Sequence, residues 1–148
     1  MTTARPDLSA RPSRCVIEST MKSSPQALYK AWTEQFDRWF AAQGTLLMRP
    51  EVDAPFFFET HYDGGRHPHY GRFLSLEPDR LVEMTWVTGA DGTEGAETVV
   101  SVEIAPRGSG SHVRLTHSGF ANQASMKRHD EAWAEVLANQ DKALSGGA

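Results

Sequence analysis

Apolar and polar residues alternate through three segments in the second half of the chain, which are residues 80–88, 97–105 and 111–118. In the first of these, the polar Thr85 separates Met84 from Trp86. Successive side chains of a β-strand point to opposite faces, so the alternation predicts strands with one apolar and one polar face. A sheet made of such strands is covered on one side only.

Turn signals divide the rest of the chain into further β-like segments. The run Asp63-Gly64-Gly65 is a strong hairpin signal. The predicted strands are residues 14–21, 45–49, 56–62, 69–76, 80–88, 97–105 and 111–118. The connections between successive strands are short, which predicts an antiparallel meander.

Apolar residues at helical spacing predict two short helices after the first strand. The first begins at Pro25, which suits a first helical turn because proline has no N–H to donate, and it follows the N-cap candidates Ser23 and Ser24. The second ends at Gly44 and carries three rings on one face, those of Phe36, Trp39 and Phe40.

A long amphipathic helix is predicted over residues 123–144. About 20 residues make a helix about 30 Å long. Its apolar stripe contains His129, Ala132, Trp133, Val136, Leu137, Gln140 and Leu144. This stripe needs an apolar surface to cover, and the apolar face of the sheet is the one available.

The predicted fold class is therefore α+β, with a helix-grip arrangement. It consists of a curved antiparallel sheet of six to seven strands, two short helices after the first strand, and a long C-terminal helix that lies across the sheet. We expect residues 1–13 to form a disordered tail, residues 14–144 to form one domain, and residues 145–148 to be a loose C-terminus.

Several short motifs, in order and at proper spacing, resemble the SRPBCC (START-like, birch-pollen-allergen-like) superfamily. They are SPQALYKAWT at residues 24–33, WF at 39–40, GRF at 71–73, RLVEMTW at 80–86, HSGF at 117–120, and the helix residues Trp133, Leu137 and Leu144. Within this superfamily, the chain looks like the branch named for homologues of the activator of the heat-shock chaperone ATPase. The resemblance implies the helix-grip fold and a stress-response setting. It leaves several functions open, because the superfamily includes ligand carriers, self-resistance proteins, chaperone-ATPase activators and cyclase-like proteins.

Large side chains on the predicted inward faces are candidates to line a ligand pocket. A long helix laid on a curved sheet leaves a gap, and apolar ligands bind in such gaps. The candidate ligand-binding residues are Trp32, Trp39, Phe58, Tyr70, Met84, Trp86, His117, Phe120 and Trp133. The alternative is that these side chains simply fill a closed core.

Among these residues, His117 is the candidate polar contact. It faces inward by alternation, and a neutral imidazole can orient a ligand group or act as a base near pH 7. The alternative is a histidine whose ring nitrogens bond to the backbone or to the helix.

Histidines also flank the predicted hairpin turn, at His61, His67 and His69, with Asp63 at the tip. Imidazoles beside a carboxylate are zinc or nickel ligands in other proteins. A polar hairpin tip is the simpler interpretation, and we expect no metal and no cofactor. The one cysteine, Cys15, lies in a β-like run and is expected to be a small buried hydrophobe.

Charge and hydropathy narrow the choice of partners. The net charge is −4 at pH 7, whereas a domain that binds nucleic acid usually has a clear basic excess. No run approaches the roughly 18 apolar residues of a membrane span, and the N-terminus lacks the apolar core of a secretory signal. We therefore expect a cytoplasmic protein, monomeric or homodimeric, that contacts neither nucleic acid nor membrane.

The function predicted from the sequence is non-catalytic binding of a small apolar or aromatic molecule between the sheet and the last helix. The first alternative is a protein-interaction module that modulates a chaperone ATPase or another partner. The second is a cyclase- or hydrolase-like enzyme that uses His117 as its base. No catalytic set is assembled in the sequence, since no nucleophile elbow, P-loop or zincin motif occurs.

Overall fold

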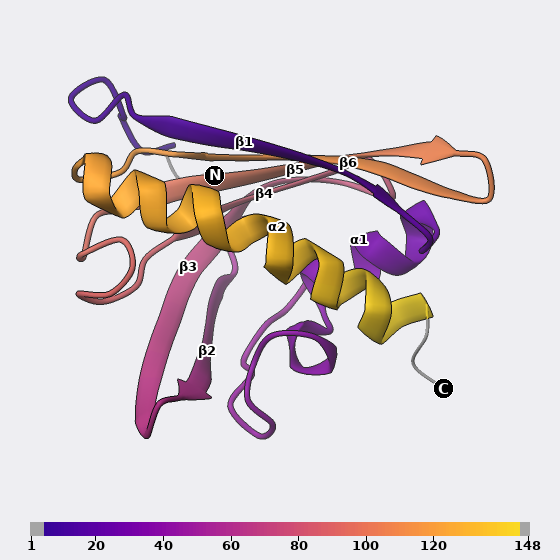
Figure 1. Cartoon of the computed structure of the whole chain (residues 1–148), viewed down its shortest axis with the longest axis horizontal. Helices are drawn as coiled ribbons and strands as arrows, with labels where there is room; N and C mark the ends of the chain where they lie inside the picture. Colours follow the sequence, from indigo (N-terminus) through magenta and orange to yellow (C-terminus); the bar gives the residue numbers. More distant parts are fainter. Residues whose placement is uncertain (1–4, 146–148) are drawn as a thin grey trace.

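The computed structural model describes residues 5–145. Within this range it contains six strands, two α-helices and one short 3-10 helix (Figure 1). Their bounds are β1 Arg14–Met21, α1 Pro25–Thr33, η1 Phe36–Arg38, β2 Pro55–Tyr62, β3 Gly65–Glu77, β4 Leu81–Trp86, β5 Thr98–Arg107, β6 Gly110–Ser118 and α2 Gln123–Ser145.

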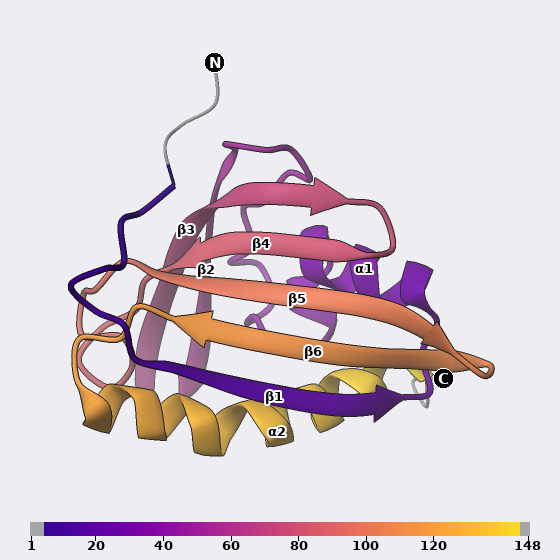
Figure 2. The ribbon, with the colours of Figure 1, turned by 90° about the horizontal axis from the view of Figure 1, so that it is seen from above.

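The strands form one antiparallel sheet in the order β1-β6-β5-β4-β3-β2. Strands β2 to β6 are a meander, and β1 pairs with β6, so the two ends of the strand sequence are neighbours. Figure 2 looks onto the sheet face that α2 does not cover. The predicted fold class, an α+β helix-grip domain, is confirmed.

Strand β3 divides its pairing between two partners. Its first part, up to Arg72, pairs with β2, and its last part, from Phe73, pairs with β4. A register shift follows Phe73. The β2–β3 hairpin therefore bends away from the other strands, on the same side as α2 (Figure 1). Its turn places Asp63 at φ 51° and Gly64 at φ 72°, the two positive φ values of a type I′ hairpin.

Helix α2 is fixed at both ends. At its start, the Asn122 side chain accepts a hydrogen bond from the Ser125 N–H (2.8 Å), which satisfies a free donor of the first turn. Near its end, the Asp141 carboxylate accepts hydrogen bonds from the backbone N–H groups of Lys22 (2.8 Å) and Ser23 (3.0 Å) and from the Ser23 hydroxyl (2.7 Å). Burial alone would raise the pKa of Asp141, but these bonds outweigh it and lower the pKa.

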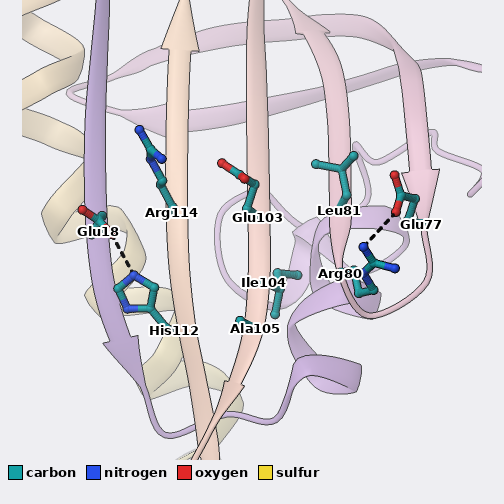
Figure 3. A pocket seen from close by; sticks show the side chains of 9 residues that line it. All are labelled: Glu18, Glu77, Arg80, Leu81, Glu103, Ile104, Ala105, His112 and Arg114. Atoms are coloured by element: carbon teal, nitrogen blue, oxygen red, sulfur yellow. Dashed lines mark hydrogen bonds and ion pairs between the residues drawn. The ribbon is translucent and has the colours of Figure 1, made fainter.

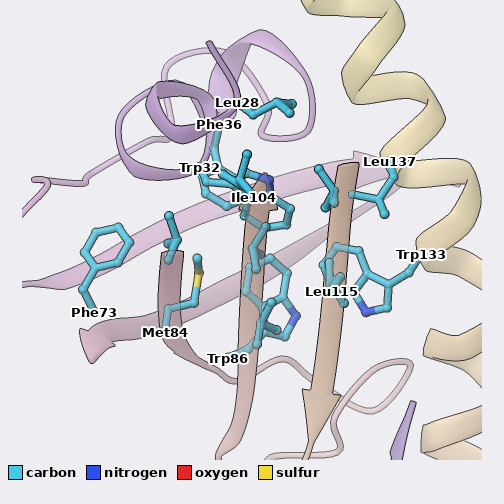
Figure 4. Packing of buried hydrophobic residues seen from close by; sticks show 14 of the residues in the cluster. Leu28, Trp32, Phe36, Phe73, Met84, Trp86, Ile104, Leu115, Trp133 and Leu137 are labelled. Atoms are coloured by element: carbon cyan, nitrogen blue, oxygen red, sulfur yellow. The ribbon is translucent and has the colours of Figure 1, made fainter. Parts of the chain in front are cut away.

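Aromatic rings fill most of the space between the sheet and the helices (Figure 4). Trp32 is fully buried against the Phe36 ring, with centroids 5.5 Å apart, and Trp133 of α2 lies 6.1 Å from Trp32. Phe36 also stacks on Phe58, at 4.9 Å. Aromatic contacts at these distances are those of a close-packed interior. In the part of the chain that the structure describes, no helix is long and apolar enough to cross a membrane.

The strand predicted at residues 45–49 is wrong. Only Leu47 pairs there, exchanging two backbone hydrogen bonds with Phe57 (2.8 and 2.9 Å). Gly44, at φ 82°, turns the chain just before this segment. The second predicted helix is reduced to the 3-10 turn η1, after which both Phe40 and Ala41 donate to the Phe36 carbonyl (2.8 Å each).

Residues 5–13 differ from the disordered tail that the sequence predicted. Arg11 donates hydrogen bonds to the carbonyls of Gly119 (2.8 Å) and Glu97 (2.7 Å), and the Leu8 side chain lies against Gly119. Charge-assisted bonds and an apolar contact together offset the entropy lost when this segment is ordered. Residues 1–4 of the expected tail, and 146–148 of the expected loose C-terminus, lie outside the described residues.

Candidate functional site

The β2–β3 hairpin, the loop after β4 and α2 enclose a cleft of about 570 Å³. We call it the outer cleft. It mixes apolar and polar side chains from these three segments and from Phe40, which follows η1. They are Phe40, Thr60, His61, Tyr62, Arg66, His67, Pro68, His69, Thr88, Gly89, Ala90, Asp91, Gly92, Ala132 and Val136.

A smaller cavity of about 80 Å³ lies next to the outer cleft. We call it the inner cavity. It is lined by Phe40, His69, Trp86, His129, Ala132, Trp133 and Val136. Four of these residues also line the outer cleft, namely Phe40, His69, Ala132 and Val136. The two spaces therefore adjoin, and the cleft leads to a cavity walled by Trp86 and Trp133, whose ring centroids are 5.6 Å apart.

His69 stands between the two spaces, held by three aromatic neighbours. Its ring stacks on Phe58 (centroids 4.8 Å, planes 14° apart) and meets Phe40 and Trp86 edge-on. Its Nδ1 lies 3.0 Å from the His67 carbonyl, which can only accept, so Nδ1 carries the proton. Burial lowers the pKa of His69 to about 4, despite that hydrogen bond. The ring is neutral at pH 7 and keeps an acceptor lone pair on Nε2.

His129 has the same tautomer as His69. Its Nδ1–H donates to the Ser125 carbonyl (2.8 Å), one turn earlier in α2. Burial lowers the pKa of His129, and the neighbouring Arg128 cation lowers it further. Two neutral imidazoles, one from β3 and one from α2, thus line the inner cavity.

His117 is completely enclosed and fully hydrogen-bonded. The indole N–H of Trp133 donates to its Nδ1 (3.0 Å), so the proton of the ring is on Nε2. Nε2–H then donates to the Thr98 hydroxyl (2.7 Å), which donates in turn to the Trp86 carbonyl. Burial, with the nearby His129, lowers the pKa of His117 well below its usual value. This arrangement joins β4, β5, β6 and α2 and leaves no ring nitrogen of His117 free for a proton transfer.

Residues 22–145 match the family of Activator of Hsp90 ATPase homolog 1-like proteins. The chain belongs to this family. The match spans both helices and all strands except β1, so it covers the outer cleft and the inner cavity. A comparison with curated proteins gives no significant match.

Solved structures share the fold at low sequence identity. A crystal structure of a protein from Mesorhizobium loti is 21% identical with a TM-score of 0.74, covering 92% of this chain and 99% of that chain. A Chromobacterium violaceum protein is 16% identical with a TM-score of 0.76, covering 90% and 98%. The Aha1 dimer from Colwellia psychrerythraea, a solution structure, is 21% identical with a TM-score of 0.67, covering 91% and 98%.

In this member of the activator-homologue family, the nine predicted ligand-binding residues fall into separate places. Trp86 and Trp133 line the inner cavity, as described above. The remaining buried candidates belong to the core and line neither the inner cavity nor the outer cleft; they are Trp32, Phe58, Met84, His117 and Phe120. Trp39 is half-buried and donates its indole N–H to the Ala31 carbonyl (3.1 Å). Tyr70 is 49% exposed on the other side of its strand.

The sequence did not single out the other residues of the inner cavity as ligand contacts. Three of them, His129, Ala132 and Val136, are in the apolar stripe of α2. The helical period therefore could have identified them as residues that face the sheet. Phe40 and His69 meet only because β3 bends at Arg72 and Phe73. The one local signal is Gly71, since a glycine inside a strand often marks a bulge or a close backbone approach, and a Cβ there would meet the Thr85 carbonyl.

The hairpin histidines do not gather around a common point. His61 bonds to Glu59 (2.9 Å), which also binds Arg66, while His67 stacks on the Tyr62 ring (3.9 Å between centroids). Within residues 5–145, no three His, Cys, Asp or Glu side chains are placed to hold a metal ion. Cys15 is buried, and desolvation raises the pKa of its thiol to about 11, which keeps it protonated.

A further groove of about 380 Å³ lies on the sheet face opposite α2 (Figure 3). Charged side chains alternate in sign across its strands, with Arg114 between its pairing partners Glu18 and Glu103. His112 also bonds to Glu18 (2.8 Å). Exposed pairs of this kind contribute little to the free energy of folding. Because each charge has an opposite charge beside it, the groove does not favour a ligand of either sign. The outer cleft and inner cavity are therefore the better candidate site.

Proposed function

We propose that this protein binds a small, mainly apolar or aromatic molecule without transforming it. The body of the ligand lies in the outer cleft, and one end enters the inner cavity, against the wall that Trp86 and Trp133 form together. The observation that carries the proposal is the junction of the two spaces through four shared residues. A cleft of about 570 Å³ is within the range typical of small-molecule sites.

The chemistry of the lining supports binding rather than catalysis. The inner cavity has no carboxylate, lysine, arginine or nucleophilic side chain among its seven residues. An acid and a base must both reach a reacting group, and His117, the base expected in the enzyme alternative, has both nitrogens hydrogen-bonded within the protein. The site offers apolar walls and hydrogen-bond acceptors.

Filling the cleft tests the proposal. Both Ala132 and Ala134 are exposed on α2, but Ala132 lines both spaces and Ala134 lines neither, so Ala134→Phe is the matched control for Ala132→Phe. We expect the neutral dye N-phenyl-1-naphthylamine, measured by calorimetry and fluorescence, to bind saturably to the wild type and to the Ala134→Phe variant. Ala132→Phe should weaken binding by about tenfold or more. Equal affinity in the two variants, or no saturable binding at all, would reject this site.

Modulation of a chaperone ATPase is the second candidate function. It is favoured by membership of the activator-homologue family and by the close filling of the interior with rings. ATP hydrolysis by an Hsp90-type chaperone, measured with and without this protein, separates the two candidates. A stoichiometric stimulation that Ala132→Phe leaves unchanged would favour a protein-interaction surface elsewhere. The Colwellia relative is a dimer, so sedimentation should accompany this assay.

A further inference from the structure

We infer that the inner cavity selects a ligand that carries a neutral hydrogen-bond donor, and that a phenolic hydroxyl is its best match. The hydroxyl donates to Nε2 of His69 or His129. This inference rests on the proposed function, because it specifies which end of the ligand enters the cavity. It starts from the tautomers of the two histidines.

Both tautomers are set by backbone carbonyls. The His67 carbonyl holds the proton of His69 on Nδ1, and the Ser125 carbonyl does the same for His129. A carbonyl oxygen accepts and never donates, so these assignments follow from chemistry alone. Each ring consequently presents Nε2 as an acceptor and has no second N–H with which to bind an anion.

The two Nε2 atoms are also the nitrogens that a ligand can reach. No residue of the described range forms a hydrogen bond with either atom. Neither atom is among the fully enclosed side-chain nitrogens without a partner, so both border accessible space. Both rings line the inner cavity. A donor from a ligand can therefore reach either acceptor and form a hydrogen bond with it.

The surroundings disfavour a charged ligand end. The inner cavity has no Lys, Arg, Asp or Glu in its lining. Arg128, which precedes His129 in α2, already binds Glu94 (2.8 Å) and the Gly92 carbonyl (2.9 Å). A carboxylate would meet two acceptor lone pairs, and an ammonium would lose its hydration without gaining an anion. A neutral hydrogen-bond donor is the ligand group that can bond to these acceptors.

The walls favour an aromatic carrier for that donor. Trp86, Trp133 and Phe40 contribute ring faces and edges to the inner cavity, and flat rings gain contact area there at little entropic cost. At about 80 Å³, the cavity admits one end of a molecule. A phenol combines a ring with a neutral O–H and suits both features.

Two probes of the same shape test the inference directly. In p-xylene, a methyl group replaces the hydroxyl of p-cresol, so the pair differs in the donor and little else. Heteronuclear NMR titration of the folded wild type gives both affinities. We expect p-cresol to bind roughly tenfold more tightly than p-xylene, the effect of one well-formed hydrogen bond, although p-xylene is the more apolar probe.

Variants then locate the acceptors. The double variant His69→Phe/His129→Phe has an aromatic ring at both positions but lacks both Nε2 acceptors. It should therefore bind the two probes about equally. His112→Phe changes a histidine on the opposite sheet face (Figure 3) and should keep the wild-type preference. A preference for p-cresol that survives in the double variant overturns the inference.

The wild-type titration is decisive even if the double variant does not fold. Equal affinities, or tighter binding of p-xylene, overturn donor selection and leave the proposed apolar site standing. If neither probe binds and Ala132→Phe has no effect on dye binding, both the proposed function and this inference fail.

Discussion

At the scale of single residues, burial sets the protonation of the three inward histidines. His69, His117 and His129 are all held neutral because a charge would lose its hydration. Their different hydrogen bonds then give them different tasks. His117 joins the sheet to α2, and the other two present acceptors to the inner cavity.

The pKa of His69 predicts a pH effect on stability. In the fold its pKa is about 4, whereas its ordinary value is 6.5. Between these values the unfolded chain binds a proton that the folded chain does not, so the free energy of unfolding falls as pH falls from 6.5 towards 4. For this residue the full loss is about 3 kcal/mol. NMR should show the His69 ring in its neutral form at pH 5. A titration midpoint of this ring near pH 6.5 would contradict its burial.

Gln140 predicts a gain in stability. Its side chain is fully buried on α2, and neither its amide nitrogen nor its amide oxygen has a hydrogen-bond partner. Desolvating such a group costs about 1–3 kcal/mol, so Gln140→Leu should raise the free energy of unfolding by a similar amount. Urea denaturation measures the change. The control is Asn139→Leu, at an exposed neighbouring position. A destabilised Gln140→Leu protein would mean that the amide has a structural role.

At the scale of elements, the grip of α2 depends on its attachment near the start of α1. Asp141 receives three hydrogen bonds from Lys22 and Ser23, which precede α1. Truncating it leaves these donors without a charged acceptor. The Ser24 cap of α1 follows directly in the sequence, so one carboxylate connects the ends of two helices.

We expect Asp141→Ala to lower the free energy of unfolding by about 1–3 kcal/mol. Thermal or urea unfolding followed by circular dichroism gives the value. Glu135→Ala is the matched control, because Glu135 is exposed on the same helix. If the two variants lose the same free energy, the attachment at Asp141 contributes nothing specific to the position of α2.

Elements with a regular period could be predicted from the sequence. Alternation located β4, β5 and β6, and the helical stripe located α2. The strand at residues 45–49 could not be rejected, because pairing depends on a partner that only the fold supplies, and there only Leu47 finds one. The bend of β3 was missed for the same reason.

The candidate site was predictable in part. Trp86 and Trp133 could be identified because each sits on the apolar face of a regular element. His69 is the counterexample. The alternation of its strand was clear, but the nearby His61 and His67 led to the interpretation of a polar hairpin tip. The contact of His69 with Phe40 depends on long-range packing. Which large side chains border space and which fill the core is decided by volume, and the sequence does not contain that information locally.

At the scale of the whole molecule, the space for a ligand lies at one end of the helix-grip fold. Rings fill the interior around Trp32, and the outer cleft lies between α2 and the β2–β3 hairpin, which bends away from the other strands (Figure 1). The pocket predicted between the sheet and the last helix is thus placed beside the middle of α2, at residues 129–136. Binding there would leave the core intact, so a ligand should raise the melting temperature without changing the fold.

The most direct test of the central claim is an NMR titration with p-cresol that follows the indole N–H signals of the four tryptophans. The account predicts saturable shifts of the Trp86 and Trp133 signals, which belong to the walls of the inner cavity, while the Trp32 signal in the closed core moves least. Shifts confined to residues of the opposite sheet face, or no indole shift at saturation, would contradict it.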